Sequence, residues 1–509
     1  MSSRLITRLL MSAAALSMSF GTGCRKHHGE EDSFQQPLLD GLPEIPNPLR
    51  GFYDWISKTK DTRMGVTSSD FYTRFTWRDL EPSQGSYDFS KIDRILSALP
   101  TGHTFSFRIS ALNGCSSPHN GQDVPDYLVG GKGWWAPLTE ASCNVPSAYI
   151  PDWNDPNFLT AANNFLSALG ARYNGDHRIG FIDIGMFGHW GEWHVLEFPY
   201  CDSNLNSLGA ELPTAASLQA IIQSHVQAFP DTQLVMMTDE KDSLLYALGL
   251  NTKIPVGMRR DSWGASIFND ATFISRRSMS GSPSPGGKCT FASSAMTDDE
   301  VAFVLNRWTK APFIVESYGS AKAFQVGNEG IVAQIQNCHV SAIGNGSWNL
   351  SWNSLDIPQQ EALATAGLSA GYRYLPKDIS LTLNGSFLEV TATWINQGSA
   401  PTYRNWNVQY FLYNKATNAS VSQLTSSLSL KTLLPTTSHG ACNTLDSAET
   451  PSGTDRTLTE ALSLSSVPAG SYELRVKVVD AVGYLSPMAL ALPTQNSDGS
   501  YTLGDWNIP

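Results

Sequence analysis

Glu192 is a carboxylate set among aromatic rings, in the segment Gly188-His-Trp-Gly-Glu-Trp-His194. The residues just before it, 181–187, form an apolar run that is typical of a buried strand. Aromatic faces can stack on the apolar faces of a pyranose, and a carboxylate can give or take a proton. Glu192 is therefore a candidate catalytic residue for sugar chemistry, which requires a second carboxylate opposite it.

Eight short apolar runs predict the strands that would position Glu192. They cover residues 51–55, 72–77, 104–109, 181–186, 233–237, 255–258, 313–315 and 340–343. Periodic stretches predict helices between them, over 89–99 (capped by Asp88 or Ser90), 157–173, 215–229 and 297–308, the last opened by a capping box at 297–300. This alternation favours a (β/α)8 TIM barrel. A doubly wound open sheet is the alternative, but no Gly-x-Gly-x-x-Gly follows its first strand.

Active-site residues of such barrels lie at the C-terminal ends of the strands. The carboxylates expected there are Glu192 after strand four, Asp239 and Glu240 after strand five, Asp261 after strand six and Glu316 at the end of strand seven. Strands four and seven lie across the lumen from each other, so Glu192 and Glu316 can face one another over a bound sugar. Otherwise Glu316 is a buried ion-pair partner of an arginine such as Arg259.

The chain resembles known glycosidases in several segments. Residues 75–89 are similar to the W-x-x-L-E-P-x-x-G-x-Y-x-F segment of β-galactosidase-like members of the retaining (β/α)8 clan. Residues 47–53, 188–194 and 371–378 resemble a bacterial family known mainly as domain of unknown function number 4832, and this resemblance covers about 47–500. The clan resemblance implies an acid/base at Glu192 and a nucleophile at Glu316. The chain departs from the clan at Gly191, where the clan has an Asn that binds the sugar 2-hydroxyl.

The mechanism that this resemblance implies has two steps. Glu192 would protonate the leaving oxygen while Glu316 attacks the anomeric carbon, and water would then release the sugar. The acid role needs a raised pKa, which we expect from burial of Glu192 between Trp190 and Trp193. Arg74 is expected to keep Glu316 ionised. The candidate sugar-binding residues are Arg74, His189, Trp190, Trp193, His194, Asp239, Tyr318 and Trp348.

Several of these segments also have a purely structural interpretation. Trp190 and Trp193 can be packing under loops, and 239–242 can be a charged loop. Residues 77–82 are expected to shape the turn into the next helix. His189 and His194 lack the spacing of the helical His-Glu-x-x-His motif, so we expect neither a metal nor a cofactor.

The pattern changes after residue 370. Runs of alternating apolar and polar residues over 379–383, 387–394, 406–412 and 470–478, separated by turn residues, predict an antiparallel β-sandwich of Ig-like size. The sequence thus divides into a barrel over 47–370 and a sandwich over 371–509.

The first 24 residues are typical of a secretory signal. A basic start precedes an apolar run over 9–20 that is shorter than the roughly 20 residues of a membrane span. Small residues leading into Cys24 resemble a bacterial lipoprotein signal with Cys24 as the lipidated residue; a plain secreted protein is the alternative. Residues 25–46, polar and Pro-rich, are expected to be a tether. These features predict an extracytoplasmic protein, at the cell surface, in the periplasm or secreted.

The remaining six cysteines fit export, because an even number permits three disulfides. Cys115 and Cys143 bracket the long connection 110–156 and are expected to pair. No Cys-x-x-Cys occurs, so a zinc or redox centre is not expected.

The net charge of −12 argues against nucleic acid or anionic membrane surfaces as partners. We expect a secreted or surface-anchored O-glycosyl hydrolase that acts on an oligo- or polysaccharide and meets the membrane only through Cys24. A non-catalytic carbohydrate-binding surface lipoprotein is one alternative, and an adhesion protein that uses the sandwich is another.

Overall fold

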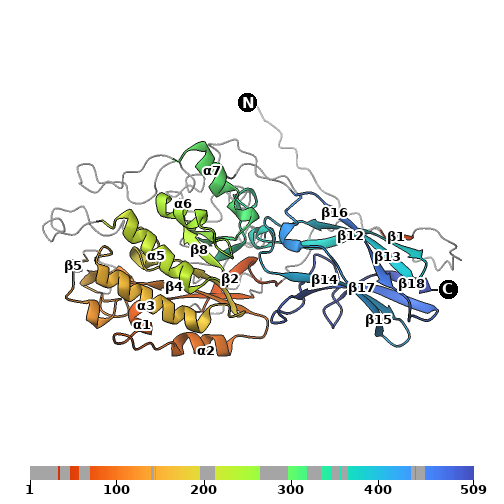
Figure 1. Ribbon diagram of the computed structural model, residues 1–509, viewed down its shortest axis with the longest axis horizontal. Coiled ribbons are helices and arrows are strands. Elements are labelled where there is room, and N and C mark those ends of the chain that lie inside the picture. Colours follow the sequence, from red (N-terminus) through yellow and green to blue (C-terminus); the bar gives the residue numbers. More distant parts are fainter. Residues whose placement is uncertain are drawn as a thin grey trace, which may run out of the picture.

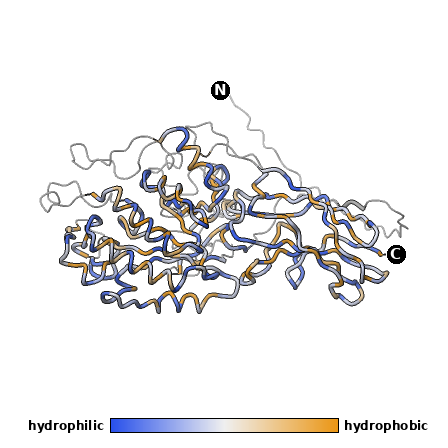
Figure 2. Tube along the Cα trace, viewed as in Figure 1, coloured by the Kyte–Doolittle hydropathy of each residue, from blue (hydrophilic) through white to orange (hydrophobic). Residues whose placement is uncertain are grey.

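The computed structural model describes residues 32–34, 46–56, 69–138, 143, 145–194, 212–263, 296–317, 334–344, 356, 365–436, 442 and 453–508. Figure 1 shows two parts, one made of strands surrounded by helices and the other of sheets alone. Apolar residues recur along the strands of both parts (Figure 2), and each part has a large hydrophobic core.

The first part is a closed barrel of eight strands (Figure 1). In chain order the strands are β2 (Gly51–Trp55), β3 (Asp70–Thr76), β4 (Thr104–Ser110), β7 (Ile179–Asp183), β8 (Leu234–Met237), β9 (Gly257–Trp263), β10 (Phe313–Ser317) and β11 (Ala342–Gly344). Each strand pairs in parallel with the next, and β11 pairs with β2 to close the ring. The predicted TIM barrel is confirmed, and the open-sheet alternative is excluded.

Helices follow most of the strands. They are α1 (Trp77–Leu80), α2 (Ser90–Ala98), α3 (Pro156–Tyr173), α5 (Ala215–Ala228), α6 (Lys241–Gly249) and α7 (Asp298–Leu305). The capping box at Thr297 and Glu300 is confirmed, but α7 ends at Leu305 and a separate 3-10 turn, Arg307–Thr309, follows it. The predicted cap of α2 is met in part: the N-cap position is Phe89, which makes no side-chain capping bond, but Asp88 Oδ1 accepts from the Ser90 backbone N–H at 3.0 Å. None of the described helices combines the length and apolar character of a membrane span.

The barrel lumen changes character along its axis. One layer of inward residues is apolar and aromatic, and it includes Tyr72, Phe181 and Ile314. Side chains two positions further along a strand point the same way. The next layer toward the C-terminal ends therefore contains Arg74, Asp183 and Glu316. The lumen thus ends in a layer of charged residues at the face where barrel active sites lie.

The second part consists of two four-stranded antiparallel sheets. One sheet contains β1 (Asp32–Phe34), β12 (Tyr374–Asn384), β13 (Phe387–Asn396) and β16 (Arg456–Ser463), and the other contains β14 (Trp406–Asn414), β15 (Ala419–Thr425), β17 (Gly470–Asp480) and β18 (Tyr501–Ile508). Their inner faces share one core, in which the Trp394 indole donates to the Tyr410 hydroxyl at 2.9 Å. The predicted sandwich is confirmed. Strand β1 lies within the segment expected to be a tether, so that stretch is an edge strand of the sandwich.

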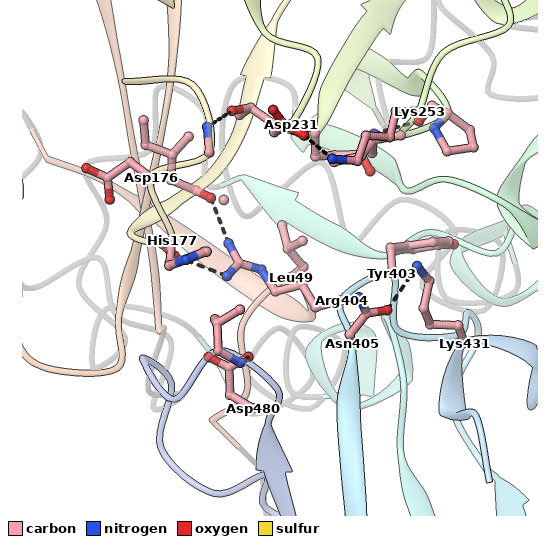
Figure 3. A pocket seen from close by; sticks show the side chains of 18 of the residues that line it. Leu49, Asp176, His177, Asp231, Lys253, Tyr403, Arg404, Asn405, Lys431 and Asp480 are labelled. Carbon is pink, nitrogen blue, oxygen red and sulfur yellow. Dashed lines mark hydrogen bonds and ion pairs between the residues drawn. The ribbon is translucent and has the colours of Figure 1, made fainter. Parts of the chain in front are cut away.

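The sandwich contacts the barrel at the N-terminal ends of the barrel strands. Arg404 donates to the backbone oxygens of His177 and Ile179 at 3.1 and 2.7 Å, and the Tyr403 hydroxyl donates to the Trp308 carbonyl at 2.6 Å. A cavity of about 350 Å³ lies beside these contacts, with residues of both parts around it (Figure 3). Because this contact lies at the N-terminal ends of the strands, it is on the opposite side of the barrel from Glu192.

Two disulfides lie in the described part of the chain. Cys115–Cys143 confirms the predicted pair, and Cys338–Cys442 connects the barrel region to the sandwich region. Cys24, Cys201 and Cys289 lie outside the described residues.

We expect the double substitution Cys338→Ser with Cys442→Ser to lower the free energy of unfolding by about 2–5 kcal/mol, because the bond constrains a long loop in the unfolded chain. The two cysteines are 104 positions apart. Urea unfolding of the variant and the wild type, both under oxidising conditions, measures the difference. A loss below about 1 kcal/mol would contradict a structural role for this bond.

Candidate active site

Arg74 joins the two candidate carboxylates at the C-terminal face of the barrel. Its Nη1 lies 2.7 Å from Glu192 Oε1, and its Nη2 lies 3.0 Å from Glu316 Oε2. Because both nitrogens belong to one planar guanidinium, the two carboxylate oxygens lie within roughly 8 Å of each other. Carboxyl pairs of glycosidases are about 5–9.5 Å apart, so this distance is compatible with such a pair. All three side chains keep a small exposed surface, between 11 and 14 %.

Glu192 accepts contacts from three donors. Its Oε1 contacts Arg74 and, at 3.3 Å, Arg108. Its Oε2 lies 3.2 Å from His194 Nε2. Burial raises the pKa of Glu192, but Arg74, the His194 hydrogen bond and Arg108 outweigh burial and hold the pKa well below its usual range. Burial thus acts on the pKa of Glu192 in the predicted direction, but the cations beneath the loop, which the prediction left out, reverse the net shift.

Glu316 ends β10 and has a different environment. Both of its donors, Arg74 and Arg259, contact the same oxygen, Oε2, at 3.0 and 2.5 Å. Burial and the neighbouring Asp261 raise the pKa of Glu316 to about 7, against the opposing effect of Arg74 and Arg259. The ion pair with Arg259 is the arrangement that the structural interpretation of Glu316 predicted. Arg74 lowers the pKa of Glu316, as its expected role requires, but burial and Asp261 outweigh it and the pKa stays raised.

The charged layer contains further residues that were not among the predicted catalytic or sugar-binding residues. Arg108 and Arg259 are fully buried, and both contact Asp183 and Asp261. Asp183 also accepts from the Tyr72 hydroxyl. An arginine or aspartate inside an otherwise apolar strand was the available signal, because a buried charge needs a partner from a neighbouring strand.

Gly191 has a physical reason to be glycine. Its φ is +73°, and an added Cβ would lie 3.1 Å from Arg108 Cδ and 3.2 Å from the Ile109 carbonyl oxygen. An Asn at this position would be strained and crowded. Glycine replaces the clan's Asn at position 191 because Arg108, which also contacts Glu192, leaves little room there for a side chain.

The aromatic residues around Glu192 divide into packing and exposed groups. Trp193 is fully buried, and its indole donates to the Ile184 carbonyl at 2.6 Å, so the prediction of a sugar-stacking role for Trp193 is wrong. His189 is also buried, with Nε2 3.1 Å from the Asn113 carbonyl, which removes it from sugar contact. Trp190 is only half-buried and stacks one face on His189, with ring centroids 3.5 Å apart. Trp190 and His194 thus remain the candidates for sugar contact in this segment.

Two further residues at this face are placed by the structure. Asp239 pairs with Arg260 at 2.7 Å, while burial raises its pKa; its other oxygen, Oδ2, accepts no hydrogen bond from the described residues. Trp55, which was not predicted as a site residue, ends β2 with its ring 4.9 Å from the Arg74 guanidinium carbon.

Glu240 caps a helix through its side chain. It accepts from the backbone of Asp242 and Ser243 at the start of α6, so the 239–242 segment is partly structural. Tyr318 and Trp348, two other candidates, lie outside the described residues.

The segment 77–82 has the structural role that was predicted for it. Glu81 accepts from the Trp77 indole at 2.6 Å, from the Gly85 backbone at 2.9 Å and from the Tyr127 hydroxyl at 3.0 Å. These bonds fix the turn that leads into α2.

No protein-family model and no curated protein matches the chain. Solved structures with a similar fold include endo-glycoceramidase II from Rhodococcus sp. in its lactosyl-enzyme intermediate, at 13 % identity and a TM-score of 0.38, covering 83 % of this chain and 100 % of that one. An exo-β-1,4-mannosidase from Opitutaceae bacterium strain TAV5 has 12 % identity and a TM-score of 0.34, covering 62 % and 53 %. The catalytic domain of a β-amylase from Paenibacillus polymyxa has 10 % identity and a TM-score of 0.35, covering 62 % and 95 %. At these identities the likeness concerns the fold alone.

Proposed function

We propose that this protein is a glycoside hydrolase that uses Glu192 and Glu316 as its catalytic pair, with retention of anomeric configuration. The observation that carries this proposal is the Arg74 guanidinium, which contacts both carboxylates at the C-terminal face of a closed barrel. Two carboxyl groups with pKa values displaced in opposite directions are what acid and nucleophile require.

The proposed substrate is a neutral oligo- or polysaccharide. Trp190, His194, Asp239 and Trp55 surround the carboxylates with half-buried aromatic rings and polar groups, the combination that binds sugar faces and hydroxyls. We further propose an extracytoplasmic location, with the signal at 1–24 and lipidation at Cys24 as the supporting sequence features.

A non-catalytic carbohydrate-binding lipoprotein is the second candidate. The specific observation that favours it is that both oxygens of Glu192 are held by cationic or hydrogen-bonding side chains. Such a protein would bind a polysaccharide without cleaving it.

A screen separates the two candidates. Wild type is incubated with a panel of aryl glycosides and with polysaccharides, and both released sugar and binding are measured. Hydrolysis that disappears in Glu192→Gln and Glu316→Gln supports the enzyme, while binding without release of sugar supports the lectin-like alternative. Glu389→Gln, on strand β13 of the sandwich, is the matched control, because it makes the same chemical change far from the barrel mouth.

A further inference from the structure

We infer that the two carboxylates exchange the roles that the clan resemblance implies: Glu316 carries the catalytic proton, and Glu192 stays ionised and attacks the anomeric carbon. This inference rests on the proposed function, and it concerns which carboxylate does which step.

The distribution of donors is the first argument. Within the part of the chain that the structure describes, four carboxylates of the charged layer share three arginines: the acids are Asp183, Glu192, Asp261 and Glu316, and the arginines are Arg74, Arg108 and Arg259. Two other side chains also donate to these carboxylates: the Tyr72 hydroxyl donates to Asp183, and His194 contacts Glu192 and not Glu316. The three arginines alone cannot balance four buried anions, and His194, the further described group here that can carry a positive charge, lies against Glu192, so the carboxyl left to hold a proton is one other than Glu192.

Glu316 is the carboxyl that this imbalance selects. Its Oε1 accepts no hydrogen bond from the described residues, and the side chain keeps 14 % of its surface exposed. The groups that face it are Arg74 on β3, Arg259 and Asp261 on β9, Tyr53 on β2 and, more distantly, Glu192. Asp261 competes for Arg74, because the same Nη2 contacts both acids at 2.9 and 3.0 Å.

Glu192 has the opposite environment. Its Oε1 binds two arginines, of which Arg108 is fully buried and cannot turn away to solvent. Among the described residues, Oε2 contacts only His194, at 3.2 Å, and it is the freer of the two oxygens. The pKa directions agree with this division, since the pKa of Glu192 is lowered and that of Glu316 is raised to about 7.

The chemical steps follow from this assignment. Glu316 donates its proton to the glycosidic oxygen as the bond from that oxygen to the anomeric carbon breaks, and Glu192 Oε2 forms an ester bond to the same carbon. A water molecule then attacks the anomeric carbon and gives its proton to Glu316. The ester bond breaks, Glu192 regains its negative charge, and the net reaction is addition of one water across the glycosidic bond.

Wild-type protein with carbon-13 at the glutamate carboxyl groups tests the ionisation order without any substrate. NMR titration, assigned with Glu192→Gln and Glu316→Gln, should give a midpoint near pH 7 for Glu316 and a midpoint below the usual glutamate range for Glu192. The reverse order would overturn the inference and leave the proposed function standing.

Azide rescue tests the roles in catalysis, using the dinitrophenyl glycoside of the sugar found by the screen. The kcat of Glu316→Ala should fall by about 100- to 10,000-fold on an alkyl glycoside. It should fall much less on the dinitrophenyl glycoside, because that leaving group needs no proton. Azide should then give a glycosyl azide with the substrate's configuration from Glu316→Ala, and one with the opposite configuration from Glu192→Ala. If instead Glu192→Ala gives the retained azide and Glu316→Ala the inverted one, the inference is overturned while the proposed function stands. If both variants keep wild-type activity on both substrates, the proposed function itself is wrong, and the inference falls with it.

Discussion

Glu192→Gln is expected to lower kcat on the cognate glycoside by at least roughly 10,000-fold, because loss of a catalytic nucleophile removes the covalent path. Glu316→Gln is expected to lower kcat by about 100- to 10,000-fold on an unactivated glycoside, which is what a general acid contributes. Both substitutions keep side-chain volume and remove one negative charge, so each changes charge far more than packing.

Steady-state kinetics on purified variants measures these losses, with circular dichroism to confirm folding. Glu389→Gln should retain full kcat, because Glu389 lies on β13 of the sandwich. Wild-type turnover in either barrel variant would contradict the assignment of the pair.

Arg259→Met is expected to lower the free energy of unfolding by about 3–5 kcal/mol, because it removes one partner of a buried ionic network and leaves the others charged. Arg259 is fully buried and contacts Asp183, Asp261 and Glu316, and its guanidinium carbon lies 4.4 Å from the Tyr72 ring. Methionine fills similar space without charge, so the lost free energy of unfolding would come mainly from the carboxylates left without a partner.

Arg172→Met is the matched control for Arg259. Arg172 pairs with Asp93 on the surface, with about half of its side chain exposed. Surface pairs contribute about 0–1 kcal/mol, so this variant should unfold at nearly the wild-type urea concentration. Equal losses for the two variants would contradict the role assigned to the buried network.

The barrel was predictable because each of its eight strands has an apolar run that periodicity detects. The boundaries were less predictable where strands hold charge. Strand β9 was expected at 255–258 but spans Gly257–Trp263, because Arg259, Arg260 and Asp261 continue the strand with polar side chains. Sequence pattern counts such residues as a strand end, whereas the barrel pairs each of them with side chains of opposite charge.

The positions of Glu192 and Glu316 were predictable from strand counting, but their environments were not. The pKa of Glu192 depends on Arg108, which is 84 positions away in the sequence and meets it only after the barrel closes. In the same way, Cys338–Cys442 could not be deduced from spacing, since six cysteines allow 15 pairings. Trp193 was a weak prediction for a different reason: an aromatic residue next to a catalytic candidate can face either the ligand or the core.

Covalent trapping of the wild-type enzyme is the most direct test of the catalytic pair and of its roles. A fluorosugar inactivator of the cognate sugar should stop turnover by forming a stable glycosyl ester, and mass spectrometry of the digested protein locates the sugar. We expect a single label, on Glu192. A label on any other residue, or hydrolysis without a covalent label, would contradict it.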